Sequence, residues 1–208
     1  MKFSFQIHRV QFTKTFGISK LSRDYQDVIR VFIKKDGISA VGETPAIPYY
    51  GLVPEKMIQD LNEKKESLQE VSWETPPEFY SSLETIFPGQ SFLRSALDGA
   101  AWDWYRQKMD RPIWQLIGTP DPATASASNF TIGLSSPAEM AKEISSNPWP
   151  SYKLKLGTDQ DEEIIKACLE VTDKPLRIDA NGAWTVERAK KLFGIFAENL
   201  PARLGTAK

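Results

Sequence analysis

The sequence predicts two regions of different fold class, an α+β region followed by an α/β region that is an incomplete TIM-type barrel. Apolar and polar residues alternate near the N-terminus as in a half-buried strand, and apolar stripes of helical spacing fill the middle of the chain. Beyond residue 129, three short apolar segments alternate with three helical segments, which is the order of a parallel sheet. A closed (β/α)₈ barrel needs eight strands, so three units leave it unfinished.

The α+β region begins as an antiparallel meander. Alternation over residues 3–8 predicts the first strand, and further strands are expected at about 27–34 and 38–44. The Asp-Gly pair between the last two is a strong hairpin signal. The polar segment at about 15–26 is expected to form one unusually long, mobile and solvated loop.

Helices follow the meander. Prolines begin the first two, at Pro54 and at Pro76, because proline suits the first turn of a helix. The clearest helix spans about 91–109 and carries an apolar stripe. Four small residues in this helix predict close packing against a neighbouring element. They are Ala96, Gly99, Ala100 and Ala101.

The second region follows a segment of prolines and small polar residues at 119–128, which is typical of a linker. The predicted domains are residues 1–118, the linker 119–128 and residues 129–208. Within the last domain, strands are expected at about 130–134, 151–157 and 175–179, and helices at about 137–146, 159–171 and 186–198. The acidic residues that begin the second of these helices, Asp161 among them, suit the helix dipole and need no ligand.

Composition excludes several classes of function. The 208 residues carry 26 Lys+Arg against 27 Asp+Glu, a formal net charge of −1, which argues against a nucleic-acid partner and against a polybasic membrane binder. A lone cysteine, Cys168, excludes a disulfide framework, and a lone histidine, His8, excludes a multi-histidine metal site in one chain. Because the sequence shows neither a signal peptide nor an apolar run of membrane-spanning length, a cytoplasmic location is expected.

Two lysines stand out in the predicted strand Tyr152-Lys153-Leu154-Lys155-Leu156. Strand side chains alternate, so Lys153 and Lys155 share one face and the apolar residues share the other. Two ammonium groups partly removed from water lower one another's pKa, and a lysine tuned in this way is a good general base near neutral pH. The alternative is a strand with a solvated lysine face, which the pattern by itself favours.

Asp179 ends the next predicted strand and is followed by Ala180, Asn181 and Gly182. Catalytic and metal-binding groups lie at that end of the strands in βα architectures, and a carboxylate suits Mg²⁺. Asp179 and Asn181 could instead shape the turn and cap the next helix. Since Lys155 ends the neighbouring strand, a base and an acidic ligand would face one cavity, which favours a functional site.

Together these residues resemble the enolase superfamily in its muconate-lactonizing-like branch, and within that branch the dipeptide epimerases. Six segments carry the resemblance: residues 42–45, 95–103, 112–118, 129–133, 153–155 and 179–181. They are similar, in this order, to the family's G-E-x-P corner, its A-(ILV)-(DE)-x-A-x-x-D helix, its P-(LIV)-x-x-L-(LI)-G turn, its first barrel strand, its K-x-K motif and its D-A-N motif. Each segment is weak alone, but their order and spacing together are specific.

The resemblance implies a capping domain over a modified TIM barrel, Mg²⁺ as the cofactor, and a dipeptide or related carboxylate as the small-molecule substrate. It implies that Lys155 exchanges the α-proton of the substrate while Mg²⁺ stabilises the enediolate. By the same resemblance, Lys153 lowers the pKa of Lys155, and Asp179 is the first of three metal ligands. Asn181 would support the ligands without binding the metal itself. Substrate contacts are implied for Lys20, Arg23 and Thr131.

The family also needs two more carboxylate ligands and, for epimerisation, a second lysine, and the sequence does not reach them. Asp179 by itself would leave Mg²⁺ holding mostly water. We therefore expect the truncated N-terminal portion of a Mg²⁺-dependent epimerase, without turnover alone. Two alternatives remain: a cycloisomerase or o-succinylbenzoate synthase-like member of the superfamily, and a non-catalytic binding module that forms homo-oligomers through its unfinished barrel edge.

Overall fold

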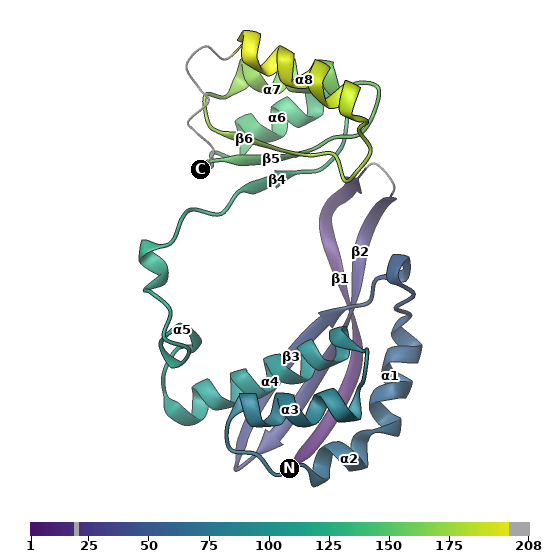
Figure 1. Ribbon diagram of the computed structural model, residues 1–208, viewed down its shortest axis with the longest axis vertical. Coiled ribbons are helices and arrows are strands. Elements are labelled where there is room, and N and C mark those ends of the chain that lie inside the picture. The colour runs from purple at the N-terminus through teal and green to yellow at the C-terminus, as the bar shows by residue number, and fades with distance from the viewer. Residues whose placement is uncertain (19–20, 200–208) are drawn as a thin grey trace. The chain divides into compact units, whose positions relative to one another are not determined.

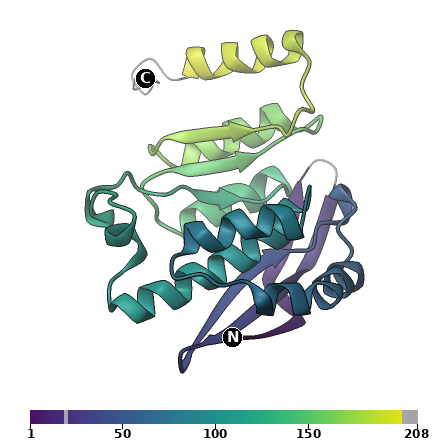
Figure 2. The same ribbon diagram turned by 60° about the horizontal axis from the view of Figure 1, so that its bottom comes forward.

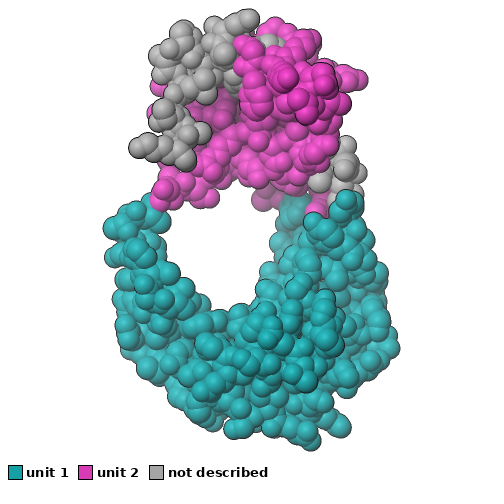
Figure 3. All heavy atoms as spheres, viewed as in Figure 1, with its two compact units in different colours: residues 1–12, 25–125 teal, residues 13–24, 126–208 magenta. Residues whose placement is uncertain are grey.

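A computed structural model describes residues 1–18 and 21–199, and it divides into two compact units. The first unit contains residues 1–12 and 25–125, and the second contains residues 13–24 and the described part of 126–208 (Figure 3). None of the described helices is long and apolar enough to cross a membrane. The domain boundaries predicted from the sequence remain a prediction.

The first unit is built on an antiparallel sheet with the strand order β1-β2-β3. Its strands are β1 (Lys2–Ile18), β2 (Leu21–Lys35) and β3 (Ile38–Pro45). The β2–β3 hairpin turns at Asp36 and Gly37, whose φ angles of 52° and 81° are the positive values that a two-residue hairpin turn requires. The hairpin predicted from the Asp-Gly pair is therefore confirmed.

The prediction of a long loop at 15–26 is wrong. β1 continues to Ile18 and β2 begins at Leu21, so the two strands form a ribbon over most of this segment. Polar contacts between the strands extend the ribbon: Arg9 donates two hydrogen bonds to Asp27, at 2.7 and 2.8 Å, and the Thr15 hydroxyl donates to Asp24 at 2.5 Å. The sequence interpretation followed apolar alternation, and polar cross-strand pairs give no such signal.

Helices cover one face of this sheet (Figures 1 and 2). They are α1 (Pro54–Glu63), α2 (Lys65–Glu70), α3 (Pro76–Ile86) and α4 (Ser91–Met109), and the short α5 (Ile113–Leu116) lies apart from the sheet in the segment after α4 (Figure 1). Two 3₁₀ turns, Pro48–Tyr50 and Pro122–Thr124, lie in the connections. Prolines at the starts of α1 and α3 agree with the sequence prediction, and Thr75 and Glu78 form a capping box at the start of α3.

Close packing joins α4 to β3, as the small residues of α4 predicted. A side chain built at Gly42 of β3 would overlap the carbonyl oxygen of Ala96, so the two backbones approach more closely than any larger residue permits. Beside this contact, Trp104 is completely buried and its indole Nε1 donates to the carbonyl oxygen of Lys35 at 3.1 Å. The core of the first unit is therefore aromatic and tightly packed.

The second unit contains three βα units around a parallel sheet with the order β4-β5-β6, which confirms the predicted incomplete barrel. The strands are β4 (Phe130–Ile132), β5 (Tyr152–Lys155) and β6 (Leu176–Asp179), and the helices are α6 (Pro137–Ser146), α7 (Asp161–Val171) and α8 (Val186–Asn199). The helices lie on one side of the sheet (Figure 1). Tyr152, Leu154 and Leu156 are buried in the apolar core of this unit.

Candidate functional site

The candidate site begins with the two lysines of β5. Because Tyr152 and Leu154 point into the apolar core, the alternating side chains of Lys153 and Lys155 lie on the opposite face of the sheet. The predicted pairing of the two lysines on one face is confirmed. The parallel register places Lys155 beside Asp179, the last residue of β6. Sequence spacing and sheet geometry thus bring a cation and an anion to the same edge.

Asp179 binds both lysines. Its Oδ2 lies 2.8 Å from the Nζ of Lys153 and 2.8 Å from the Nζ of Lys155. The Lys155 side chain is 12% exposed and the Lys153 side chain is 38% exposed, so Lys155 is the more enclosed of the two. The structure therefore gathers Lys153, Lys155 and Asp179 into one cluster, which we call the strand-end cluster.

Asn181 completes the strand-end cluster. Its backbone N–H donates to Asp179 Oδ1 at 3.0 Å, and its side-chain Oδ1 accepts from Lys155 Nζ at 3.2 Å. Asn181 has a φ of 50° and Gly182 a φ of 73°, left-handed values that asparagine and glycine tolerate best. Asn181 therefore both shapes this turn and contacts the lysine, and its functional role stays a prediction.

The charge of Asp179 is strongly stabilised. Hydrogen bonds from Lys153 and Lys155 hold the pKa of the Asp179 carboxyl far below its usual range, and the Asn181 amide adds to the lowering. Partial burial acts in the opposite direction and is outweighed. The sequence argument placed two ammonium groups against each other, and the structure places a carboxylate between them. Mutual lowering of the lysine pKa values stays a prediction.

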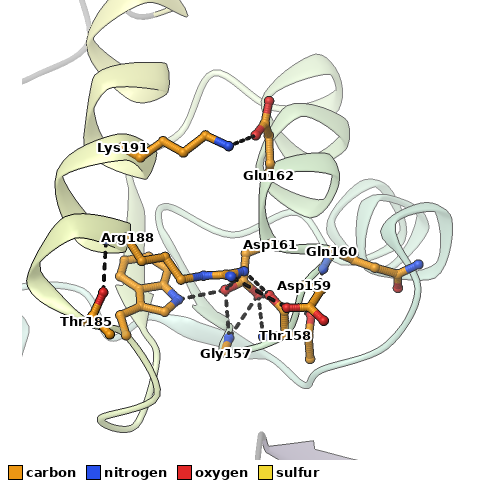
Figure 4. Close-up of polar contacts among 10 residues, drawn as sticks. Gly157, Thr158, Asp159, Gln160, Asp161, Glu162, Thr185, Arg188 and Lys191 are labelled. Carbon is orange, nitrogen blue, oxygen red and sulfur yellow. Dashed lines mark hydrogen bonds and ion pairs between the residues drawn. The ribbon is translucent and has the colours of Figure 1, made fainter.

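Asp161 is the residue that sequence reasoning missed. The sequence predicts only an acidic helix start that suits the helix dipole, but the side chain of Asp161 is completely buried, and the N–H groups of Gly157 and Thr158 donate to its carboxylate at 2.9 to 3.1 Å (Figure 4). The indole Nε1 of Trp184 donates to its Oδ2 at 2.7 Å. No local pattern signals this burial, because Asp161 lies among other acidic residues and its donor Trp184 lies 23 residues further along the chain.

Two of the residues predicted to contact substrate, Thr131 and Arg23, lie in the second unit. Thr131 lies beside Lys153 in the register of β4 and β5, and it lines a cavity of about 600 Å³. Lys14 of β1 lines the same cavity and forms an ion pair with Glu143 of α6. Arg23 lies on β2, half-buried. Lys20 lies outside the described residues.

The strand-end cluster does not by itself fit a firmly held Mg²⁺. A carboxylate is the right type of ligand, but both oxygens of Asp179 already accept hydrogen bonds from Lys153, Lys155 and Asn181. Among residues 1–18 and 21–199 no group of three His, Cys, Asp or Glu side chains could hold a metal ion. The described part of the chain therefore offers one candidate ligand to a metal.

Solved structures share the fold of this chain. The chain superposes on a dipeptide epimerase from Cytophaga hutchinsonii, crystallised with Mg and D-Ala-L-Val, with a TM-score of 0.83 at 22% identity, covering 95% of this chain and 56% of that one. An enolase family member from Agrobacterium tumefaciens, with bound sodium and L-Ala-L-Glu, gives 0.80 at 24% identity over 95% and 59%. This chain therefore shares its fold with these two proteins.

Curated relatives narrow the class. L-Ala-D/L-amino acid epimerases from a Maribacter species and from Flavobacterium johnsoniae are 34% and 33% identical over 187 and 190 residues, which cover 90% of this chain. The predicted resemblance to dipeptide epimerases, isomerases of the enolase superfamily, is thereby confirmed. The chain spans about 55% of the length of these relatives and corresponds to their N-terminal part. No family model matches the chain.

Proposed function

We propose that this chain carries the first lysine and the first metal ligand of a Mg²⁺-dependent dipeptide epimerase. The observation that carries the proposal is the strand-end cluster, in which Lys155 and Asp179 lie 2.8 Å apart at the ends of adjacent parallel strands. Dipeptide epimerases of known structure share this fold, and one of them was crystallised with Mg and L-Leu-L-Tyr. We also propose that the enzyme is soluble and cytoplasmic.

Each residue of the cluster has a distinct part in the proposed reaction. In its neutral amine form, Lys155 accepts the α-proton of the dipeptide on its Nζ and holds it there, and epimerisation follows when a second acid delivers a different proton to the opposite face of the carbon. Lys153 supplies a second positive charge that attracts the substrate carboxylate. Asn181 fixes the Lys155 ammonium by accepting its hydrogen bond. Mg²⁺, when bound, would stabilise negative charge that develops on the substrate carboxylate.

Asp179 alone would leave a metal mostly hydrated, so the proposal requires further ligands from outside the described residues. It also requires a second acid–base group on the other face of the substrate. The 208-residue chain is therefore expected to show no turnover by itself. Thr131, Lys20 and Arg23 are proposed to contact the substrate, which is a dipeptide or a related small carboxylate.

A fusion protein tests the proposal. Residues 1–199 are joined to the remaining C-terminal part of the Maribacter relative, and exchange of the α-hydrogen of L-Ala-L-Glu is followed by NMR in D₂O with Mg²⁺. Exchange is expected in the fusion. Lys155→Arg keeps a positive charge beside Asp179 but cannot act as a base, so we expect a loss of about 10²- to 10⁴-fold. Lys166→Arg, on the exposed side of α7, is the matched control and should retain full activity.

Failure of Lys155→Arg to reduce exchange would sink the assignment of Lys155. Epimerisation by the unfused 208-residue chain would instead overturn the expectation that it is inactive alone. A fusion that folds and shows no exchange with any dipeptide would favour a non-catalytic binding module. The oligomeric state of the chain would then be the next property to measure.

A second candidate activity rests on a separate similarity. An o-succinylbenzoate synthase from Geobacillus stearothermophilus is 25% identical over 198 residues, 88% of this chain, and a muconate lactonizing enzyme shares the fold with a TM-score of 0.79. Both reactions would use the same strand-end cluster. Assaying the fusion with muconate-type acids beside the dipeptide panel separates these activities, because each substrate reports its own product.

A further inference from the structure

The carboxylate of Asp161 collects donors from two loops. From the β5–α7 loop it accepts the N–H of Gly157 at 2.9 and 3.1 Å and the N–H of Thr158 at 2.9 Å, and the Thr158 hydroxyl lies 3.3 Å away. From the segment after β6 it accepts the indole N–H of Trp184 at 2.7 Å, and the Arg188 guanidinium lies 3.6 Å from Oδ2 (Figure 4). The buried charge is therefore fully surrounded by donors.

The neighbours of Asp161 show that this arrangement is more than an acidic helix start. Asp159 and Glu163 are exposed, and Glu162 forms surface ion pairs with Lys166 and Lys191. Asp161 is not the N-cap of α7, because Gln160 holds that position and the backbone donors to Asp161 lie in the loop before the helix. The Oδ2 oxygen of Asp161 accepts from Gly157 at 3.1 Å and also from Trp184, which belongs to a different βα unit, at 2.7 Å.

Both connected loops directly follow residues of the strand-end cluster. Gly157 comes two residues after Lys155, and Trp184 comes five residues after Asp179. Two more bonds join the same segments: the Leu156 N–H donates to the Asp179 carbonyl oxygen at 3.0 Å, and Arg188 donates to the Thr158 carbonyl oxygen. The carboxylate of Asp161 thus links the chain that carries the lysine to the chain that carries the acid.

We propose that Asp161 is a positioning residue, which ties the β5–α7 loop to Trp184 and Arg188 and so holds Lys155 against Asp179. Its value for catalysis rests on the proposed function, but the positioning itself concerns this chain alone. Burial makes the tie strong, because a charged acceptor removed from water forms short, strong hydrogen bonds. Displacement of either loop would move one partner of the strand-end cluster.

Asp161→Asn tests the tie in the 208-residue chain. The remaining Oδ1 can still accept from Gly157 and Thr158, but the Nδ2 amide group then faces the N–H of Trp184, so donor meets donor and the link to the second loop breaks. Two-dimensional NMR spectra follow the indole Nε1–H of Trp184, the Lys155 side chain and the Asn181 amide. We expect all three signals to shift, and exchange of the Asn181 amide hydrogen to become about tenfold faster or more.

Two further variants keep the test decisive. Trp184→Phe removes the indole N–H and keeps an aromatic ring, so it should move the Lys155 and Asn181 signals in the same way, and it decides the matter if Asp161→Asn does not fold. Glu162→Gln is the matched control on the same helical turn, and it should leave these signals in place.

A lower unfolding midpoint with unmoved Lys155 and Asn181 signals would overturn the proposal, because it would leave Asp161 with a purely structural role. The readouts need no turnover, so the two proposals fail separately. An inactive fusion with shifted signals would contradict the proposed function alone, and an active fusion with unmoved signals would contradict the positioning alone.

Discussion

The two sheets of this chain have three strands each, but they arrange their charged residues in different ways. On the antiparallel sheet, two arginines each meet one carboxylate on the neighbouring strand: Arg9 meets Asp27, and Arg30 meets Glu43. On the parallel sheet, Lys153 and Lys155 share the single carboxylate of Asp179. A pair of one cation and one anion stabilises a surface and has no net charge. Two lysines on one acid leave a positive charge available to a carboxylate substrate.

The largest expected effect tests whether the first unit is built for stability. Trp104→Ala removes the completely buried indole and its bond to the Lys35 carbonyl, so it should lower the free energy of unfolding by about 3–5 kcal/mol. Urea unfolding followed by circular dichroism measures this. Tyr49→Ala, at a side chain 75% exposed, should change it by less than about 0.5 kcal/mol. Equal losses would remove the distinction between core and surface in this unit.

Gly42→Ala sharpens the same point. The added methyl group would overlap the backbone of α4 at Ala96, so the strand and the helix must separate, at a cost of about 1–3 kcal/mol. Gly194→Ala is the control, because a methyl group there meets open space within α8 and should stabilise the helix by about 0.5–1 kcal/mol. An unchanged free energy of unfolding in Gly42→Ala would show that α4 and β3 can move apart at no cost.

Acid titration tests the shared carboxylate. The folded-state pKa of Asp179 lies below its unfolded value of about 3.9, so its stabilising contribution is present above about pH 4 and is lost as the pH falls below it. Urea midpoints measured from pH 6 down to pH 2 should fall more steeply for the natural protein than for Asp179→Asn. Asp173→Asn, at an exposed acid, should follow the natural protein. Parallel curves for all three would show that the lysines do not stabilise the Asp179 charge.

The smallest effect is expected where charges pair one to one. Arg30→Gln breaks the ion pair with Glu43 on the antiparallel sheet, and since both side chains are partly exposed the cost should be about 0.2–1 kcal/mol. Thermal unfolding at low and high salt measures it, and added salt should shrink the difference. A larger loss, unchanged by salt, would mean that this pair is a buried structural element.

Much of the second unit could be predicted from the sequence. The order of strands and helices, the shared face of Lys153 and Lys155, and the meeting of Lys155 with Asp179 all follow from alternation and from the rule that parallel strands end at one edge. The burial of Asp161 could not be predicted, since its donor Trp184 lies 23 residues away and belongs to another loop. Local patterns describe neighbours along the chain, and this contact depends on tertiary packing.

The first unit was predicted less completely. The small residues of α4 predicted a close contact with a neighbouring element, and the structure shows that this neighbour is β3 at Gly42. The extension of β1 and β2 was missed, because it depends on polar pairs such as Thr15 with Asp24 rather than on apolar alternation. Hydrophobic patterning therefore predicts buried faces well. It predicts the ends of strands poorly where their side chains are polar.

The division of the β1–β2 ribbon between the two units has a consequence for how the chain can be cut. Residues 13–24 belong to the second unit while the flanking residues belong to the first, so the backbone passes between the units three times, near residues 12, 24 and 125. A protease that cleaves the exposed segment 119–128 severs one of these passages and leaves the other two intact. The C-terminal fragment keeps its contacts with residues 13–24 of the N-terminal fragment, because both belong to the second unit. The two fragments should therefore co-purify under native conditions and separate only in denaturant.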